Sequence, residues 1–311
     1  MKGLELARKY YEAFGRAMIR ESFPEYEEMI AAGLTGSGSE CYGYDDEISE
    51  DHDFEPGFCL FIPGEDIVDR KTAFQMERAY ARLPSEFEGY HRQKMGPAGG
   101  QRHGVFRIQE YFQDRIGCLP ENLTPERWLR LPEYVLAEAV NGEMFQDTLS
   151  LMEDQRNILR RMPEEIRRKK LAGHLLMMAQ SGQYNYTRCI RHGEPGAAQL
   201  AVTEYVRHTM AALFLLNRKY MPYYKWCFRA FRELPDQSEN ARLLEEMICT
   251  GNDPETAEAK YFRIEALASE VIDMLQAQDL TRASCGDLEK HAYSVNDGIR
   301  DSWIRSQPMM E

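Results

Sequence analysis

The stretch from Gly36 to Asp53 constrains the fold of this chain more than any other part of it. It opens with the turn Gly-Ser-Gly-Ser and closes with Asp51 and Asp53, and thirteen residues separate Ser37 from Asp51. Side chains of a strand alternate between its two faces, so a strand here would present both aspartates on one face. Two neighbouring carboxylates repel each other unless a cation lies between them. Asp51 and Asp53 are therefore predicted to hold Mg²⁺ or Mn²⁺.

The turn that precedes these aspartates is predicted to bind phosphate. Its residues offer backbone N–H groups with little side-chain bulk, which suits an anion with several oxygens. Gly36, Ser37 and Ser39 are the predicted nucleotide-binding residues of this turn. An acidic and glycine-rich segment is also typical of a solvated loop, and the residues alone leave that alternative open.

A Gly-Ser pair followed by Asp-x-Asp resembles the signature of the DNA-polymerase-β-like nucleotidyltransferase superfamily. The wider stretch from Ala31 to Phe54, which ends in Glu-Asp-His-Asp-Phe, is similar to a bacterial branch of these proteins. The similarity continues at Gly142 to Asp147 and at Asn217 to Trp226, so it spans most of the chain. It implies a small mixed-sheet nucleotidyltransferase domain followed by a helical domain.

The resemblance also implies a reaction. A nucleoside triphosphate would donate its nucleoside monophosphate, most simply AMP from ATP, to the hydroxyl of a small molecule, a protein or a tRNA. Gly36 and Ser37 would contact the phosphates, while Asp51 and Asp53 would hold the metal ion. Proteins of this superfamily often carry a third carboxylate on a later strand. The candidates for that position are Glu88, Glu110 and Asp147.

Composition restricts the partners of the chain. Of its 311 residues, 43% are hydrophobic and 29% are charged, which is typical of a globular protein, and the net charge of −13 disfavours general nucleic-acid binding. No apolar run is long enough to span a membrane, and the first ten residues lack the apolar core of a secretory signal. The seven cysteines are scattered without metal-binding spacing. These features predict a cytoplasmic protein with free thiols.

Periodicity predicts an α+β fold. Helices are expected over 4–32, with a break at Pro24, and over 65–83. Short strands are expected to carry Gly36 and Ser37 and to run over 58–62 and 105–111. A proline-containing connector over 119–131 places the domain boundary at 120/121. Residues 1–120 are then the nucleotidyltransferase-like domain, and residues 121–311 are an all-helical, substrate-binding bundle around the apolar helix 197–216.

Three residues of the second part are candidates for the same chemistry. Arg188 can grip a phosphate in a bidentate manner, or it can belong to an ordinary interhelical ion pair. Lys225 stands beside Tyr-Tyr and Trp, a grouping that suits a stacked base and a phosphate, or an aromatic-packed turn. Glu204 belongs to the apolar helix, where burial would raise the pKa of its carboxyl and make it a base, unless it pairs with a residue such as Arg188.

Two alternatives do not require nucleotide transfer. The chain can be a nucleotide-sensing module that lacks turnover, or an interaction protein of the toxin–antitoxin type. Helical partners in such systems can be RNases with an Arg-x4–6-His motif. Arg168 and His174, with five residues between them, have that spacing.

Overall fold

The computed structural model describes residues 1–47, 54–92 and 102–309, and the chain divides into two compact units. Unit 1 comprises Met1–Leu123 and Val135–Arg161, and unit 2 comprises Thr124–Tyr134 and Met162–Glu311. The fold class is α+β, with most residues in helices and a small mixed sheet of four strands. None of the described helices is both long and apolar enough to cross a membrane.

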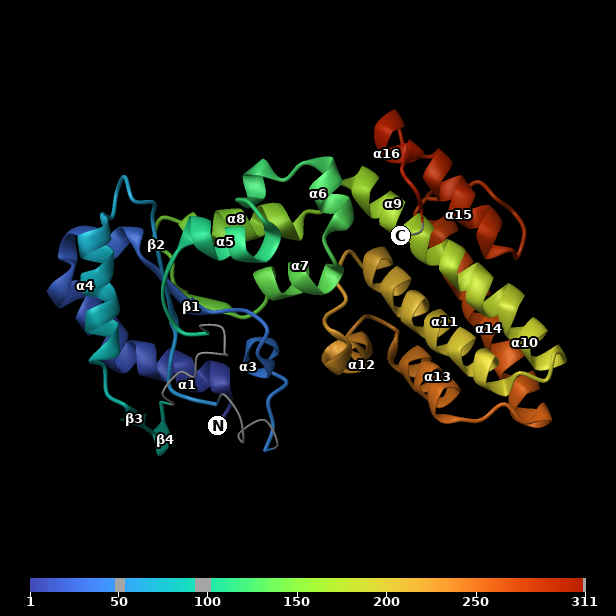
Figure 1. The fold of residues 1–311 in the computed structure, drawn as a ribbon, viewed down its shortest axis with the longest axis horizontal. Helices are drawn as coiled ribbons and strands as arrows, with labels where there is room; N and C mark the ends of the chain where they lie inside the picture. The colour runs from blue at the N-terminus through green and yellow to red at the C-terminus, as the bar shows by residue number, and fades with distance from the viewer. Residues whose placement is uncertain (48–53, 93–101, 310–311) are drawn as a thin grey trace. The chain divides into compact units, whose positions relative to one another are not determined.

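Unit 1 holds the sheet, whose strands lie in the order β5-β2-β1-β6 (Figure 1). β1 is antiparallel to β2 and to β6, whereas β2 and β5 are parallel. The elements of this unit are α1 (Gly3–Tyr10), η1 (Tyr11–Gly15), α2 (Arg16–Ser22), η2 (Pro24–Met29), β1 (Ala31–Leu34), α3 (Ser39–Tyr42), β2 (Cys59–Ile62), α4 (Arg70–Ala81), β3 (Glu86–Phe87), β4 (Tyr90–His91), β5 (Gly104–Arg107), α5 (Ile108–Ile116), η4 (Pro120–Asn122), α7 (Glu133–Val140, which begins in unit 2), β6 (Glu143–Gln146) and α8 (Leu151–Arg160).

The two faces of the sheet follow the alternation of side chains along β2. Leu60 and Ile62 belong to one core together with residues of α1, η1, α2 and α4. Phe61 points the other way, where its ring lies 5.0 Å from that of Tyr111 on α5. The all-buried strand β2 therefore serves two helical layers at once, as expected for a short apolar run that is covered on both faces.

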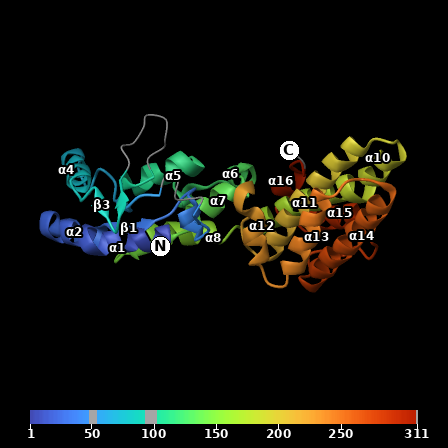
Figure 2. The ribbon, with the colours of Figure 1, turned by 90° about the horizontal axis from the view of Figure 1, so that it is seen from below.

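Unit 2 is a helical assembly around one large core. Its central helices α9, α11, α14 and α15 run side by side in Figure 1, and the second view is consistent with this arrangement (Figure 2). The elements are α6 (Pro125–Arg130), α9 (Glu164–Met178), η5 (Ala179–Tyr186), α10 (Thr187–Arg191), α11 (Pro195–Leu216), α12 (Tyr224–Arg232), α13 (Ser238–Cys249), α14 (Pro254–Ala277), α15 (Leu288–Asp297) and α16 (Ser302–Ser306).

The division of the chain differs from the predicted single boundary at 120/121. Residues 135–161 belong to unit 1, because β6 pairs with β1 and α8 follows β6 directly. The expectation that residues 121–311 are entirely helical is therefore wrong at Glu143–Gln146. The physical reason is that β6 completes an edge of a sheet whose other strands come from much earlier in the chain.

Candidate functional site

At one side of the sheet in unit 1, where strands begin or end and which we call the sheet edge, the predicted phosphate-binding turn meets the segments that lead into two other strands. The carboxyl end of β1 and the amino ends of β2 and β5 meet at this edge, because β1 is antiparallel to β2 and β2 is parallel to β5. Gly36 follows β1, Glu55 precedes β2, and His103 directly precedes β5. Nδ1 of His103 lies 3.2 Å from Oε1 of Glu55, which ties the approaches to β2 and β5 together.

The conformation of Gly36 is fixed by the side chain of Asn141. The N–H of Gly36 donates to Oδ1 of Asn141 over 2.9 Å, and Nδ2 of Asn141 donates back to the carbonyl of Gly36 over 2.7 Å. Gly36 has φ of +135°, a value that favours glycine over residues with a Cβ. The N–H of Gly36 is thus engaged by Asn141, and the contact of Gly36 with a nucleotide stays a prediction.

Asn141 is itself held by a second layer of contacts. Nη2 of the buried Arg156 donates to the carbonyls of Val140 and Asn141 over 2.8 and 2.5 Å. The next residue, Gly142, has φ of +66° and donates its N–H to the carbonyl of Cys41, and a Cβ there would collide with the carbonyl of Leu34. The turn that begins at Gly36 is thus positioned by residues more than one hundred positions later.

Several donors remain at the turn itself. Ser37 is exposed, and within the described part of the chain neither its N–H nor that of Gly38 has an acceptor. A terminal nitrogen of Arg115 lies 3.6 Å from the place that a Cβ on Gly36 would occupy. The Arg115 guanidinium stacks 3.7 Å above the Tyr111 ring, and none of the described carboxylates lies within ion-pair distance of it. Arg115 is thus a cation beside the turn, and the sequence did not predict it.

Carboxylates also approach this edge. The Glu40 side chain folds back into the space that a Cβ on Gly38 would fill, and it lies 3.8 Å from Nη1 of Arg102. Glu138 on α7 is half-buried, and burial raises the pKa of its carboxyl while Arg115 and Arg102 oppose that shift. Neither Glu40 nor Glu138 was among the sequence candidates for a third carboxylate.

The three predicted third carboxylates do not serve this edge. Glu110 is exposed on α5, and Glu88 is exposed in the turn between β3 and β4 with φ of 52°. Asp147 accepts N–H bonds from Met152 and Glu153 at the start of α8, where it caps that helix. Asp51 and Asp53 lie outside the described residues. Ser39 begins α3, half-buried, with its hydroxyl 3.5 Å from Oε2 of Glu40.

The predicted residues of the second half of the chain belong to unit 2. Glu204 is not buried: its side chain is 46% exposed and pairs with Arg207 at 3.0 Å rather than with Arg188. The expectation of a buried base at Glu204 is wrong, because it lies at the solvent-facing side of α11 next to Arg207. Arg188 is exposed, and its guanidinium donates to the Tyr184 hydroxyl over 2.9 Å and lies over the Tyr184 ring.

Lys225 and the pair Arg168 and His174, which has the spacing of an RNase motif, also lie in unit 2. Lys225 is exposed at the start of α12, with its Nζ 5.0 Å from the ring of Trp226. Arg168 and His174 share α9 but not a site. Arg168 lies in one cavity and 3.4 Å from Glu164, whereas His174 lines another cavity and contacts His208. The spacing of five residues turns the helix far enough to separate the two side chains.

A protein-family match covers part of the chain. Residues 128–227 match the family described as "Domain of unknown function (DUF4037)". The matched region includes Asn141, Gly142 and both residues of the His174–His208 contact. No curated protein and no solved structure matches the chain.

Proposed function

We propose that the chain is a metal-dependent nucleotidyltransferase that moves a nucleoside monophosphate, most simply AMP from ATP, to a hydroxyl acceptor. The observation that carries this proposal is the meeting of the Gly-Ser turn with the approaches to β2 and β5 at one sheet edge. Asp53 directly precedes Phe54 in the sequence, so the Asp51–Asp53 pair is joined to the approach to β2 by the chain itself.

The charges at this edge support phosphate binding. The N–H groups of Ser37 and Gly38 and the guanidinium of Arg115 provide donors of the kind that a triphosphate requires. No described group of three or more His, Cys, Asp or Glu side chains could hold a metal ion. Asp51 and Asp53 would hold Mg²⁺ or Mn²⁺ together with the phosphate oxygens, and the bound ion would neutralise charge that develops on those oxygens.

In the proposed reaction the acceptor hydroxyl attacks the α-phosphorus, the bond from that phosphorus to the bridging oxygen breaks, and pyrophosphate leaves. Arg115 stabilises the negative charge of the leaving pyrophosphate. Glu138 accepts the hydroxyl proton, because its raised pKa brings it nearer to that of an effective base at neutral pH. Unit 2 binds the acceptor, which is a small molecule, a protein or a tRNA.

A nucleotide-binding protein without transfer activity is the second candidate. The Glu40 carboxylate lies over Gly38, where it repels a phosphate until a cation balances it. In a sensor this repulsion would make binding depend on the metal while no product forms. The toxin–antitoxin RNase reading has no comparable support, because Arg168 and His174 lie in separate cavities.

The deciding experiment is transfer of radiolabel from each α-labelled nucleoside triphosphate, with Mg²⁺ and a cell extract as the source of acceptor. We expect label transfer by the wild type and none by Asp51→Ala/Asp53→Ala, while the surface control Asp66→Ala retains full transfer. Metal-dependent nucleotide binding without transfer would support the sensor. Absence of both binding and transfer would refute the site.

A further inference from the structure

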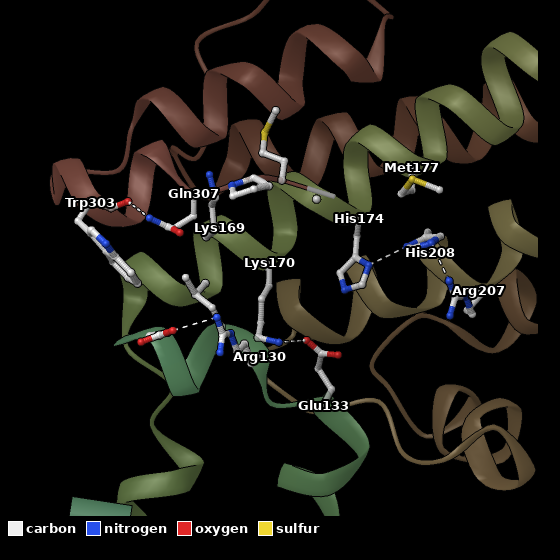
Figure 3. A pocket seen from close by; sticks show the side chains of 15 residues that line it. Arg130, Glu133, Lys169, Lys170, His174, Met177, Arg207, His208, Trp303 and Gln307 are labelled. Carbon is white, nitrogen blue, oxygen red and sulfur yellow. Dashed lines mark hydrogen bonds and ion pairs between the residues drawn. The ribbon is translucent and has the colours of Figure 1, made fainter. Parts of the chain in front are cut away.

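Unit 2 contains a cavity of about 290 Å³ that the proposed reaction does not use (Figure 3). It lies among α6, α9, α11 and the segment that begins with α16. Its charged and titratable lining consists of Glu126, Arg130, Glu133, Lys169, Lys170, His174, Arg207 and His208. The remaining lining is mostly apolar and is contributed by Leu129, Gly173, Met177, Trp303, Gln307, Pro308 and Met309.

Three of the four cations at this cavity are balanced by carboxylates. Arg130 pairs with Glu126 at 2.9 Å, Lys170 pairs with Glu133 at 3.0 Å, and Arg207 pairs with Glu204 at 3.0 Å. These pairs leave one cation, Lys169, without a carboxylate in the described part of the chain. A buried positive charge of this kind favours an anion in the adjoining space.

Lys169 is 3% exposed, and its Nζ is held by two neutral acceptors. It donates to Oδ1 of Asn296 over 2.8 Å and to the carbonyl of Arg305 over 2.9 Å. An ammonium group has three N–H donors, and no described residue accepts the third. Burial also lowers the pKa of Lys169, which shows that its environment disfavours the charge it carries. An anion would relieve that penalty.

The neighbouring Lys170 is in a similar position. Its Nζ donates to the carbonyl of Leu131 over 2.7 Å and pairs with Glu133, and both side chains of that pair are less than 15% exposed. Within the described contacts one of its three N–H groups is again unused. Two consecutive lysines of α9 thus line the same cavity, and Figure 3 shows the Lys170 side chain running toward Glu133 while that of Lys169 leaves the helix in another direction.

The contact between His174 and His208 is the third feature of this cavity. Nδ1 of His174 lies 2.8 Å from Nδ1 of His208, so one of these nitrogens carries a proton and the other accepts it. The histidine that donates has a bare Nε2. That Nε2 can take up a proton without breaking the bond between the two rings, so the pair can gain one positive charge in place.

The charged groups around the histidine pair determine the pH at which the pair takes up this proton. Nε2 of His208 lies 3.2 Å from a nitrogen of Arg207 and 3.4 Å from Oε2 of Glu204, while Glu133 and Lys170 act on His174 from the other side. Burial lowers the pKa of both rings, and that of His208 falls to about 3. The pair is therefore neutral at pH 7, and an anion nearby would raise both pKa values.

We propose that this cavity binds a phosphomonoester group of a small molecule as the dianion, and that the His174–His208 pair takes up one proton when it binds. Lys169 and the protonated pair together balance two negative charges, and the spare N–H groups of Lys169 and Lys170 bond to the phosphate oxygens. Trp303 and the two methionines provide an apolar wall for the rest of the ligand. All lining residues belong to unit 2, so this inference is independent of nucleotide transfer at the sheet edge.

The test is isothermal titration of the full chain with two probes, sulfate and phenyl phosphate. Sulfate stays a dianion from pH 5 to 8, so any pH dependence of its binding reports on the protein. Comparing two buffers of different ionisation enthalpy measures the protons taken up. We expect about one proton per sulfate bound, tighter sulfate binding as pH falls, and tighter binding of phenyl phosphate than of sulfate.

Variants assign the effect to the named residues. Lys169→Met should weaken sulfate binding by roughly 10- to 100-fold, since it removes one charged donor. Arg130→Gln, on a side chain that is 70% exposed, should weaken it several-fold through loss of charge and should leave the fold intact. His208→Gln should retain weaker binding but lose proton uptake. Lys290→Met, an exposed lysine at a different cavity of the same unit, is the matched control and should bind as the wild type does.

Three results would overturn the proposal. The first is absence of binding of both probes by the wild type. The second is binding that neither Lys169→Met nor Arg130→Gln changes relative to Lys290→Met. The third is binding without proton uptake, or with equal uptake in His208→Gln. Circular dichroism melting of each variant excludes loss of fold as the cause of lost binding.

Discussion

The sheet edge of unit 1 is built around the backbone of a turn with charged side chains beside it, whereas the polar groups in the cavity of unit 2 are side chains of helical residues. Gly36 is held by two hydrogen bonds with Asn141, one donated by each residue, and it needs an unusual backbone angle. His174, His208 and Lys169 need only regular helix, but burial shifts their pKa values. The comparison indicates that the first site is sensitive to backbone geometry and the second to pH.

The largest expected effect separates chemistry from folding at the sheet edge. Asp51→Ala and Asp53→Ala should each lower the rate of nucleotide transfer by about 1,000-fold, because the metal that stabilises the transition state loses a ligand. The melting temperature should stay within a few degrees of that of Asp66→Ala. Single-turnover kinetics measures the rate, and an unchanged rate in both variants would remove the sheet edge from the reaction.

The next prediction tests whether unit 1 depends on backbone geometry. Gly142→Ala should lower the free energy of unfolding by about 3 kcal/mol, because Gly142 has φ of +66° and its Cβ would collide with the carbonyl of Leu34. Gly43 has a similar φ of +69° but no atom within 4 Å of its Cβ position. Gly43→Ala should therefore lose only about 1 kcal/mol. Urea unfolding measures both variants. Equal losses in the free energy of unfolding would show that the backbone around Gly142 shifts to avoid the collision.

The third prediction tests the pH sensitivity of unit 2 in the absence of anions. Unfolded His208 titrates near its ordinary pKa of about 6.5, whereas in the folded chain burial lowers its pKa to about 3. Between these values the unfolded state binds more protons, so stability falls as pH drops below about 6.5. From pH 7 to pH 5 the titration of His208 should lower the free energy of unfolding by about 2 kcal/mol.

His208→Gln is the variant that isolates the contribution of His208 to the pH dependence of stability. It removes the titrating ring and keeps a side chain that can donate and accept hydrogen bonds. Urea unfolding at pH 5 and pH 7 should show a smaller difference in the variant than in the wild type. Identical pH dependence in the two proteins would place the titration elsewhere.

The smallest expected effect concerns the hydrogen bonds by which Asn141 holds the Gly-Ser turn. Asn141→Ala removes both bonds to Gly36, a buried residue, and should lower the free energy of unfolding by about 1 to 2 kcal/mol. Asn141→Asp keeps the acceptor for the Gly36 N–H but loses the donor and adds a negative charge beside the turn, so it should weaken nucleotide affinity more than Asn141→Ala does. Fluorescence titration ranks the nucleotide affinities of the wild type and the two variants. Equal affinity in all three proteins would show that nucleotide binding does not depend on the bonds between Asn141 and Gly36.

Local patterns accounted for much of the fold. The apolar run 58–62 predicted β2 and the apolar stretch 197–216 predicted the central helix α11, whereas the strand expected at Gly36 and Ser37 lies earlier, at Ala31–Leu34. Each of these segments has a strong internal pattern that burial satisfies directly. The predicted strand 105–111 is only half strand, since α5 begins at Ile108 and buries Tyr111 and Phe112 against the sheet.

β6 shows why the remainder was not predictable in this way. The tetrapeptide Glu-Met-Phe-Gln is short and exposed to intermediate in burial, so it has no strong period of its own. It becomes a strand because β1 has a free edge to pair with. The dipeptide Asn141-Gly142 was the available signal, since Asn-Gly marks a turn, but its role at Gly36 depends on a contact across 105 positions.

The sequence by itself determined the elements with strong local patterns and the chemical character of the Gly-Ser turn, because residue type and spacing are properties of neighbouring positions. Only the tertiary structure decided that Asn141 fixes Gly36, that Arg115 and Glu138 approach that turn, and that Glu204 faces solvent. It also decided that His174 contacts His208 in a cavity that Lys169 and Lys170 line as well. The physical reason is that burial, hydrogen-bond partners and pKa depend on which distant segments pack together, and no local spacing encodes that packing.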